Sequence, residues 1–391
     1  MYVEHDSADA AAPPRVRVSR TASSLPPSAR SDVAEERETH VIVSTGSGTG
    51  QAATFFDEAV RPLLRTLFPS SYHGFSVYHT ESASSIINLT SDIFFPRANK
   101  GTAIRIVLFS GDGGVIDVLN SLVSKPHTAD YTPPQVVLIP LGTANALYHS
   151  INGGKENTWG LNSLASSSYH PLPIFTATFS PGARLLADEA RREEELPKDP
   201  KTGTPTLHGA VVCSWGMHAS LVGDSDTAEY RKFGVERFKM AAKEALFPAD
   251  GSLPHPYKAK VSILQGETWK PLEQEEHMYV LASMVSNLEK TFTISPASKP
   301  LDGSLHLVQF GPADGNEAMR IMGLAYQGGK HVEDEAVFYE AIDGLRIQFE
   351  GKEEDGRWRR ICVDGKIVRL ENDGWVEMRK ESMRVLDVAC S

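Results

Sequence analysis

The chain has 391 residues, of which 41% are hydrophobic and 23% are charged, and its formal net charge at pH 7 is −11. This length allows two domains, and the composition is ordinary for a globular protein. The acidic balance argues against a nucleic-acid-binding protein and against purely electrostatic attraction to anionic lipid.

Three scattered cysteines, Cys213, Cys362 and Cys390, follow no metal-binding spacing, so we interpret them as reduced intracellular thiols. No run approaches the ~18 apolar residues of a membrane span, and the N-terminal segment lacks the apolar core of a signal peptide. We therefore expect a cytoplasmic protein. A lipid substrate would require transient, peripheral association with a membrane.

Residues 1–38 are rich in Ala, Ser and Pro and carry few large apolar side chains. Such a segment cannot bury enough surface to offset the entropy lost on ordering, so we predict a disordered tail.

Strands and helices alternate over residues 39–152, with short links between them. The predicted strands are 40–45, 75–80, 102–110 and 135–140, and the predicted helices are 52–67, 84–95, 115–123 and 144–151. Pro62 is expected to kink the first helix. The alternation predicts a doubly wound parallel α/β domain, to which a strand near the C-terminus is a candidate addition. Ligands of such sheets bind beyond the carboxyl ends of the strands.

Residues 153–391 are rich in strands and form a predicted second domain, mostly antiparallel β. Its predicted strands are 208–216, 257–265, 277–287, 303–310, 344–350 and 357–368, and its predicted helices are 228–246 and 317–327. Asp302-Gly303 and Asp364-Gly365 are turn signals. The charged segment 184–206 is predicted to be a mobile loop.

Three of the four strand ends in the α/β domain carry small residues, at 46–50, 110–114 and 141–145, and each precedes a helix. A helix N-terminus offers unpaired amides and a partial positive charge, which favour phosphate. Asp112 lies between glycines and cannot itself attract phosphate, so its presence indicates Mg²⁺. Asp117 is a second candidate ligand, although the start of a helix also accounts for it.

The same loops do not fit two other nucleotide motifs. The first loop reads GSGTGQ, so residue 51 is Gln where a dinucleotide fingerprint has Gly, and Glu81 follows at about 30 residues instead of ~20. A nicotinamide dehydrogenase would also leave the loop at 110–114 unexplained. No GxxxxGK[ST] segment occurs, which excludes a P-loop.

Several segments together resemble the catalytic domain shared by diacylglycerol, ceramide and sphingosine kinases, most closely that of the sphingosine kinases. Residues 110–122 resemble the family's [SG]-G-D-G…E-V-x-N-G-L element, and residues 140–147 resemble P-x-G-[ST]-x-N-x-[LF]. Residues 230–238 resemble the Y-R-x-x-G-x-x-R-[FY] segment of sphingosine kinases. Thr80-Glu81, residues 302–305 and residues 363–365 resemble further signatures. The similarity covers about residues 40–380.

This resemblance implies ATP-dependent phosphorylation of a lipid hydroxyl. The implied fold is an N-terminal doubly wound α/β nucleotide domain followed by a C-terminal antiparallel β-sandwich that holds the lipid. The implied cofactors are ATP and Mg²⁺. The implied partner is a lipid at a membrane surface; a homodimer stays open, and nucleic acid is not expected.

The resemblance also implies roles for individual residues. Those implied to bind the nucleotide are Gly46, Ser47, Gly48, Thr80, Ser110, Gly111, Asp112, Gly113, Gly142, Thr143, Asn145, Arg231, Arg237, Asp364 and Gly365. Those implied to lie near the lipid are Met217, His218, Phe238 and His331. The catalytic candidates are Asp112, Asp224 and Asp226, and the metal candidates are Asp112 and Asp117.

Plainer interpretations compete with these roles. The threonines are also ordinary loop residues, and the histidines are also typical of a protein core. Arg231 and Arg237 also fit a solvated surface, and their spacing of six does not align them on one helical face.

The chain departs from the family pattern at three places. The first loop reads Ser44-Thr45-Gly46, without the basic residue that the family often carries, and Lys366 replaces the acid of the family's D-G-E element. An ungapped reading puts Val222 at the pocket acid of sphingosine kinases, with Asp224 and Asp226 as nearby substitutes. A base must reach the substrate hydroxyl. Asp112 or one of these acids must therefore supply it; otherwise the protein is a pseudokinase.

We therefore expect an ATP- and Mg²⁺-dependent lipid kinase that acts on a primary hydroxyl of a sphingoid base. Diacylglycerol and ceramide are the alternative substrates. From another class, the alternative is a catalytically impaired pseudokinase that binds lipid or nucleotide.

Overall fold

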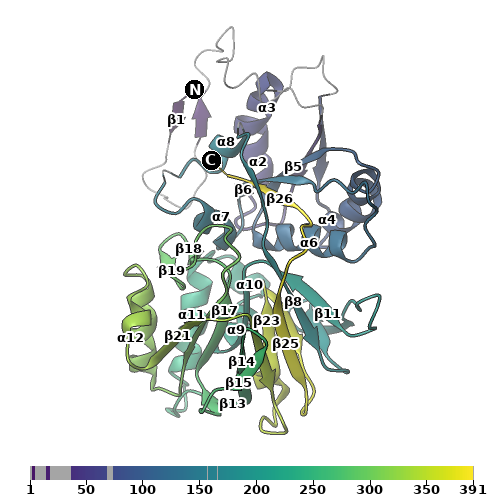
Figure 1. The fold of residues 1–391 in the computed structure, drawn as a ribbon. Coiled ribbons are helices and arrows are strands. Elements are labelled where there is room, and N and C mark those ends of the chain that lie inside the picture. The colour runs from purple at the N-terminus through teal and green to yellow at the C-terminus, as the bar shows by residue number, and fades with distance from the viewer. Residues whose placement is uncertain are drawn as a thin grey trace. The chain divides into compact units, whose positions relative to one another are not determined.

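The computed structural model describes residues 2–4, 15–17, 37–67, 74–155, 157–164 and 166–390 (Figure 1). The chain divides into two compact units. The first comprises residues 1–148, 152–172 and 384–391, and the second comprises residues 149–151 and 173–383. The predicted first domain ends at residue 152. In the structure the first unit continues to Leu172, because a strand at residues 169–171 belongs to its sheet.

One sheet organises the first unit. Its described strands, in spatial order, are β4 (Phe75–His79), β3 (Glu38–Val43), β5 (Ile104–Ser110), β6 (Gln135–Pro140), β26 (Asp387–Ala389) and β7 (Tyr169–Pro171). The first five run parallel, and only β7 is antiparallel to its neighbour β26. The predicted parallel α/β fold is confirmed, and the C-terminal strand joins it beside β6.

The helices of the first unit follow the strands as the alternating pattern predicts. In chain order they are α2 (Ala52–Phe55), η1 (Phe56–Val60), α3 (Arg61–Leu67), α4 (Ser85–Leu89), η2 (Thr90–Phe94), α5 (Phe95–Ala98), α6 (Asp112–Val123) and α7 (Ala146–Ile151), whose last three residues fall in the second unit. A further short helix, α8 (Leu161–Leu164), is not predicted from the sequence. Segment η1 is a π-helical turn that ends two residues before Pro62. A proline ring clashes with the carbonyl four residues earlier, and a wider turn relieves that clash.

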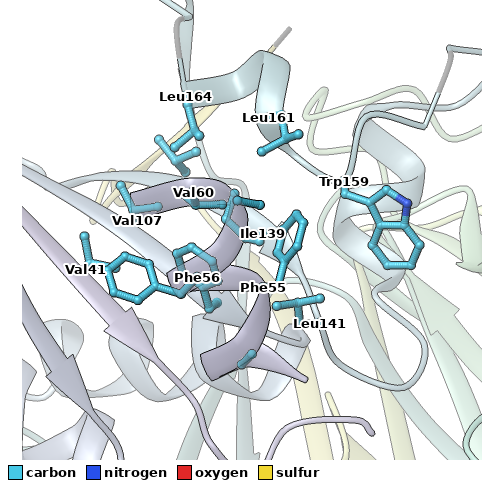
Figure 2. Packing of buried hydrophobic residues seen from close by; sticks show 14 of the residues in the cluster. Val41, Phe55, Phe56, Val60, Val107, Ile139, Leu141, Trp159, Leu161 and Leu164 are labelled. Carbon is cyan, nitrogen blue, oxygen red and sulfur yellow. The ribbon is translucent and has the colours of Figure 1, made fainter. Parts of the chain in front are cut away.

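The core of the first unit forms where the first helical segment crosses the sheet. Phe56 and Val60 pack against Val41 and Val107 of the neighbouring strands β3 and β5 (Figure 2). Strands β5 and β6 are buried at every position, which is typical of parallel strands covered on both faces. This burial fixes the strand ends from which the glycine loops emerge.

Two antiparallel sheets build the second unit, as the sequence predicts. The larger described sheet has the order β10 (Arg192–Glu195), β9 (Arg184–Ala187), β24 (Lys366–Arg369), β23 (Arg360–Val363), β12 (Val212–Gly216), β17 (Tyr279–Ser283), β20 (His306–Phe310) and β21 (Val337–Ala341). The other has the order β11 (Thr206–Gly209), β8 (Ile174–Phe179), β25 (Trp375–Glu381), β22 (Gly344–Gln348), β14 (Lys260–Gln265) and β15 (Thr268–Pro271). The predicted β-rich class is confirmed.

Short pairs and helices complete the second unit. The small hairpins join β13 (Tyr257–Lys258) with β16 (Glu276–His277) and β18 (Asn287–Glu289) with β19 (Phe292–Thr293). The helices are α9 (Met217–Asp224), α10 (Ala228–Arg231), α11 (Glu236–Leu246), α12 (Gly315–Ala325), η3 (Lys330–Glu333) and η4 (Gly356–Arg359).

Several predicted elements of the second unit are divided in the structure. The helix predicted over 228–246 breaks into α10 and α11, with Gly234 in the left-handed region at φ +54° between them. The strand predicted over 208–216 is two strands in different sheets. The segment 184–206, predicted as a mobile loop, instead contains the β9–β10 hairpin, which extends the larger sheet through pairing of β9 with β24.

The predicted disordered tail falls mostly outside the described residues. Two short strands within it, β1 (Tyr2–Glu4) and β2 (Arg15–Arg17), are described and pair antiparallel. Among the helices that the structure describes, none combines the length and the apolar character needed to cross a bilayer.

The C-terminal segment, residues 384–391, belongs to the first unit, and we predict that it contributes to the stability of that unit. Leu386 is fully buried, so Leu386→Ala should lower the free energy of unfolding by about 2–5 kcal/mol. Met383, just before this segment, is 44% exposed, so Met383→Ala should change the free energy of unfolding by less than about 0.5 kcal/mol. Urea denaturation measures both; equal stability of the two variants would contradict this role for the C-terminal segment.

Candidate functional site

The three predicted glycine loops meet at one edge of the first unit's sheet. Strands β3, β5 and β6 are parallel neighbours, so the loops that leave their carboxyl ends lie side by side. This edge is where a doubly wound sheet binds its ligands.

Some of the loop glycines are required because backbone packs on backbone. A Cβ built on Gly142 would lie 2.3 Å from the Cα of Gly111, and one on Gly48 would lie 2.5 Å from the carbonyl oxygen of Leu141. Gly48 also has φ +52°, which favours glycine. These glycines therefore hold the three loops together, a role that needs no ligand.

Gly46 and Gly113 are different. A Cβ built on either would meet no heavy atom of the described residues within 4 Å outside its own chain neighbours, and neither has a positive φ. Neither packing nor backbone conformation requires glycine at these two positions. The structure thus separates glycines that join the loops from glycines that leave open space above them.

Asp112 links two of the loops through its carboxylate. The N–H of Ala146 donates to Oδ2 at 2.7 Å, and the N–H of Leu147 donates to Oδ1 at 3.0 Å. Asp112 thus caps the start of α7, whose preceding residue Asn145 is left-handed at φ 56° and accepts from the N–H of Gly142 at 2.9 Å. Burial raises the pKa of Asp112, and the two amide hydrogen bonds oppose that rise.

Hydroxyl groups connect the loops on the same edge. Ser47 Oγ lies 3.1 Å from Ser110 Oγ, which joins the loops after β3 and β5. The N–H of Thr45 donates to Thr80 Oγ1 at 3.0 Å, which joins the loop after β3 to the end of β4. The predicted residues Ser47 and Ser110 are therefore brought together, and Thr80 is held by Thr45 of the loop after β3. Thr143 is half-buried in the loop after β6. Thr45 is not predicted from the sequence, because its partner Thr80 is 35 residues away.

The two metal candidates lie on one helix but not on one face. Helix α6 begins directly after Gly111 without a side-chain cap among the described residues, so its first amides remain available to a phosphate. Asp117 follows Asp112 by five residues, which is about 140° around an α-helix. The described residues contain no group of three or more His, Cys, Asp or Glu side chains that could hold a metal ion.

In the second unit, the two predicted phosphate-binding arginines converge on one acid. Arg231 Nε donates to Asp226 Oδ1 at 3.0 Å, and Arg237 Nη1 lies 3.5 Å from the same oxygen. The break at Gly234 allows this, since a continuous helix would separate the two side chains. Within the described structure Arg237 Nε is buried without a hydrogen-bond partner, and burial lowers the pKa of this guanidinium.

Asp224, the other catalytic candidate in this unit, is held by two further arginines. Its carboxylate accepts from Arg360 Nη1 at 2.8 Å and from Arg357 Nη2 at 3.0 Å. Burial alone would raise the pKa of Asp224, but these two guanidinium groups outweigh it and lower the pKa. Val222, at the position where sphingosine kinases are expected to place an acid, packs in a small apolar cluster with Ala219 and other core residues.

Asp364 and Gly365 form the tight turn of the β23–β24 hairpin. Both have positive φ, 48° and 86°, which is the geometry of an Asp-Gly type I′ turn. The Asp364 carboxylate is buried and accepts from the N–H groups of Ala210, Val211 and Val212. This carboxylate has a structural role, and its assignment to nucleotide binding stays a prediction.

The four predicted lipid-contacting residues lie largely in the core of the second unit. Met217 and His331 are almost fully buried, and His331 Nε2 lies 3.1 Å from the carbonyl oxygen of Ile294. His218 Nδ1 lies 2.7 Å from Ser214 Oγ, and burial lowers the pKa of His218 to about 4. Phe238 is half-buried beneath the Arg237 guanidinium. Core packing accounts for these contacts, and lipid binding stays a prediction.

Comparisons with known proteins agree with this geometry. Residues 38–177, which contain all three loops, match the family model of the diacylglycerol kinase catalytic domain. Sphingosine kinase 1 of Homo sapiens is 21% identical over 366 residues, which cover 85% of this chain and 86% of that protein. Sphingosine kinase 2 of Homo sapiens is 25% identical over 210 residues, 51% of this chain and 27% of that protein.

Solved structures share the fold. A diacylglycerol kinase from Bacillus anthracis str. Sterne superimposes with a TM-score of 0.56 at 16% identity, covering 91% of this chain and 97% of that one. The predicted resemblance to diacylglycerol and sphingosine kinases is therefore confirmed.

The division of the glycines into two kinds predicts opposite effects on stability. Gly142→Ala should lower the free energy of unfolding by about 1–3 kcal/mol, because its Cβ meets backbone that must move. Gly113→Ala should leave it unchanged or raise it by up to about 1 kcal/mol, since alanine favours the helix. Urea denaturation compares the two variants, and equal losses would contradict the division.

Proposed function

We propose that this chain, whose residues 38–177 match the family model of the diacylglycerol kinase catalytic domain, is a lipid kinase that transfers the γ-phosphate of ATP to a primary hydroxyl of a sphingoid base. One observation carries the nucleotide part of the proposal. Gly46 and Gly113 leave open space on two adjacent loops, beside the uncapped start of α6.

The residues at this edge fit the phosphates of ATP. Amides at the start of α6 supply donors and a partial positive charge, and Gly46 and Gly113 remove the side chains that would block the approach. The hydroxyls of Ser47 and Ser110 add donors on the same edge. Backbone contact among the loops fixes these groups before the ligand arrives, which lowers the cost of binding.

A magnesium ion fits this donor set through one carboxylate. The two amide bonds to Asp112 use two of the roughly four lone-pair sites of a carboxylate, so further acceptor capacity remains. Mg²⁺ is commonly held by one or two carboxylates together with substrate phosphates. When bound, Mg²⁺ neutralises charge on the phosphates of ATP, which supplies the transferred phosphoryl group. We propose Asp112 for this position and not Asp117, which points to another side of the helix.

We also propose Asp112 as the residue that accepts the proton of the lipid hydroxyl. Asp224 and Asp226 are each held by two guanidinium groups. For Asp224 this pairing lowers the pKa, which weakens its carboxylate as a base. The Asp112 carboxylate is held by two neutral amides instead.

The similarity to sphingosine kinases over 85% of the chain and the Tyr-Arg segment at 230–238 support a sphingoid base. One observation favours an uncharged lipid as a second candidate. A sphingoid amine needs a carboxylate partner, but Val222 is packed in an apolar cluster, and Asp224 and Asp226 are occupied by arginines. Ceramide and diacylglycerol are uncharged and need no carboxylate partner in the protein.

A transfer assay with radiolabelled ATP against sphingosine, ceramide and diacylglycerol tests the proposal. We expect phosphorylated sphingosine, and Asp112→Asn should reduce kcat by about 100-fold or more, because it removes the carboxylate charge and one amide acceptor. Asp117→Asn is the matched control and should stay within about twofold. Product from ceramide or diacylglycerol alone would contradict the sphingoid substrate. ATP binding without any product would identify a pseudokinase.

The open glycines give a second test. Gly46→Ala and Gly113→Ala should each raise the KM for ATP by about tenfold or more, because the added methyl group would keep phosphate from one amide donor. Losing one hydrogen bond to a charged group has an effect of this size. The KM for lipid should not rise. Gly323 in α12 of the second unit is equally open, and Gly323→Ala should leave both constants unchanged. Unchanged KM for ATP in the first two variants would place the nucleotide elsewhere.

A further inference from the structure

The charged hairpin of strands β9 and β10 ends in a turn with an unusual backbone. Residues Asp188, Glu189 and Ala190 all have positive φ, at 51°, 59° and 62°. Residues other than glycine adopt this region at a cost, and three in succession require support from their surroundings. Contacts with the surrounding residues must therefore hold the turn in this conformation.

That conformation directs Glu189 to the start of α10. Glu189 Oε1 accepts from the N–H of Ala228 at 2.7 Å, and the opposite oxygen accepts from Arg191. Thr227 Oγ1 accepts from the N–H of Tyr230 at 3.2 Å, so the two side chains satisfy two separate amides of the first turn. A helix of four residues, α10, is thus capped from 39 residues away in the sequence.

The capped helix carries Arg231 at its last position. Arg231 donates a hydrogen bond to Asp226, and the charge of Glu189 also acts on its guanidinium. The N–H of Ala228 is the main cause of the lowered pKa of Glu189, and Arg191 and Arg231 lower it further. Tyr230 adds a hydrogen bond from its hydroxyl to Glu244 of α11, which ties the two helices together.

The hairpin itself is firmly attached to the larger sheet. Strand β9 pairs with β24, and Leu186 packs against the apolar cluster around Ala219 and Ile367. The Glu193 carboxylate binds Arg369 of β24 through two hydrogen bonds, at 2.7 and 3.1 Å. The turn at 188–191 is therefore a fixed support for α10.

We propose that Glu189 is a positioning residue that holds α10, and with it Arg231, in the geometry for phosphate binding. The proposal rests on the function proposed above and on the expectation from the sequence resemblance that Arg231 and Arg237 bind phosphate. It assigns a role to the charged hairpin that neither the motifs nor the fold class gives.

Two variants of Glu189 separate positioning from charge. Glu189→Gln keeps an acceptor for the Ala228 N–H but removes the negative charge near Arg231. Glu189→Ala removes both. If Glu189 acted only through its charge, both variants would lower the KM for ATP, because a negative charge near the arginines disfavours phosphate. Positioning predicts that Glu189→Ala raises the KM for ATP about three- to tenfold, while Glu189→Gln leaves it unchanged or lowers it.

Hydrogen exchange supplies a readout that does not depend on activity. In the full-length protein, Glu189→Ala should speed exchange of the amides at 228–231 about three- to tenfold, whereas Glu189→Gln should stay within about twofold of the native rate. Glu195→Ala removes the same charge from an exposed position on the same hairpin and is the matched control, with no change expected at 228–231.

The outcomes distinguish this proposal from the proposed function. Native exchange at 228–231 in Glu189→Ala, or a lowered KM for ATP in both Glu189 variants, overturns the positioning role even if the kinase is active. If the native protein phosphorylates no lipid, the proposed function fails, and the dissociation constant of ATP replaces KM. A weaker affinity in Glu189→Ala alone then supports positioning, and equal affinities overturn it.

Discussion

The direct contact between the backbones of three glycine loops is the constraint on which the proposed site depends. The backbone of Gly142 contacts that of Gly111, and Gly48 contacts the carbonyl of Leu141, so any side chain at these positions would separate the loops. The Asp112 carboxylate then joins the loop after β5 to the first turn of α7. The loops are thereby fixed relative to one another without a ligand, and Gly46 and Gly113 face open space at defined positions. Preorganised amides of this kind stabilise phosphate charge at little further cost.

In both units, a carboxylate that is distant in sequence accepts hydrogen bonds from backbone amides. Asp112 caps α7 in the first unit. In the second unit, Asp364 accepts from three successive amides at 210–212, and Glu189 caps α10. Buried amides without partners are costly, so Asp112 and Asp364 stabilise the buried segments whose amides they accept from, whereas Glu189 caps an exposed helix start. For Asp112 and Asp364, the residue types that suggest chemistry in the sequence first perform a structural task.

The fold class, the four parallel strands β3 to β6 and the three loops are predicted correctly from the sequence, because each depends on local pattern. The short edge strand β7 is not predicted. Hydrophobic runs such as 104–110 and 135–140 identify buried parallel strands, and the strand order puts their ends together. Local pattern does not reveal which glycines touch other loops, because Gly46 and Gly48 look alike until the neighbouring loop is placed. It also does not reveal that Arg231 and Arg237 share one acid, since that depends on the break at Gly234. The hairpin at 184–195 is missed because its charge suggests solvent exposure, while its order comes from pairing with a distant strand, β24.

Amide chemical shifts during titration with ATP and Mg²⁺ test the central claim most directly. The account predicts that the signals of Gly46 and Gly113 move strongly and saturate together, because their amides lie where phosphate is proposed to bind. Gly323, on a helix of the second unit, should not move. If ATP leaves Gly46 and Gly113 unchanged while a nicotinamide dinucleotide shifts them, the proposed nucleotide site is wrong.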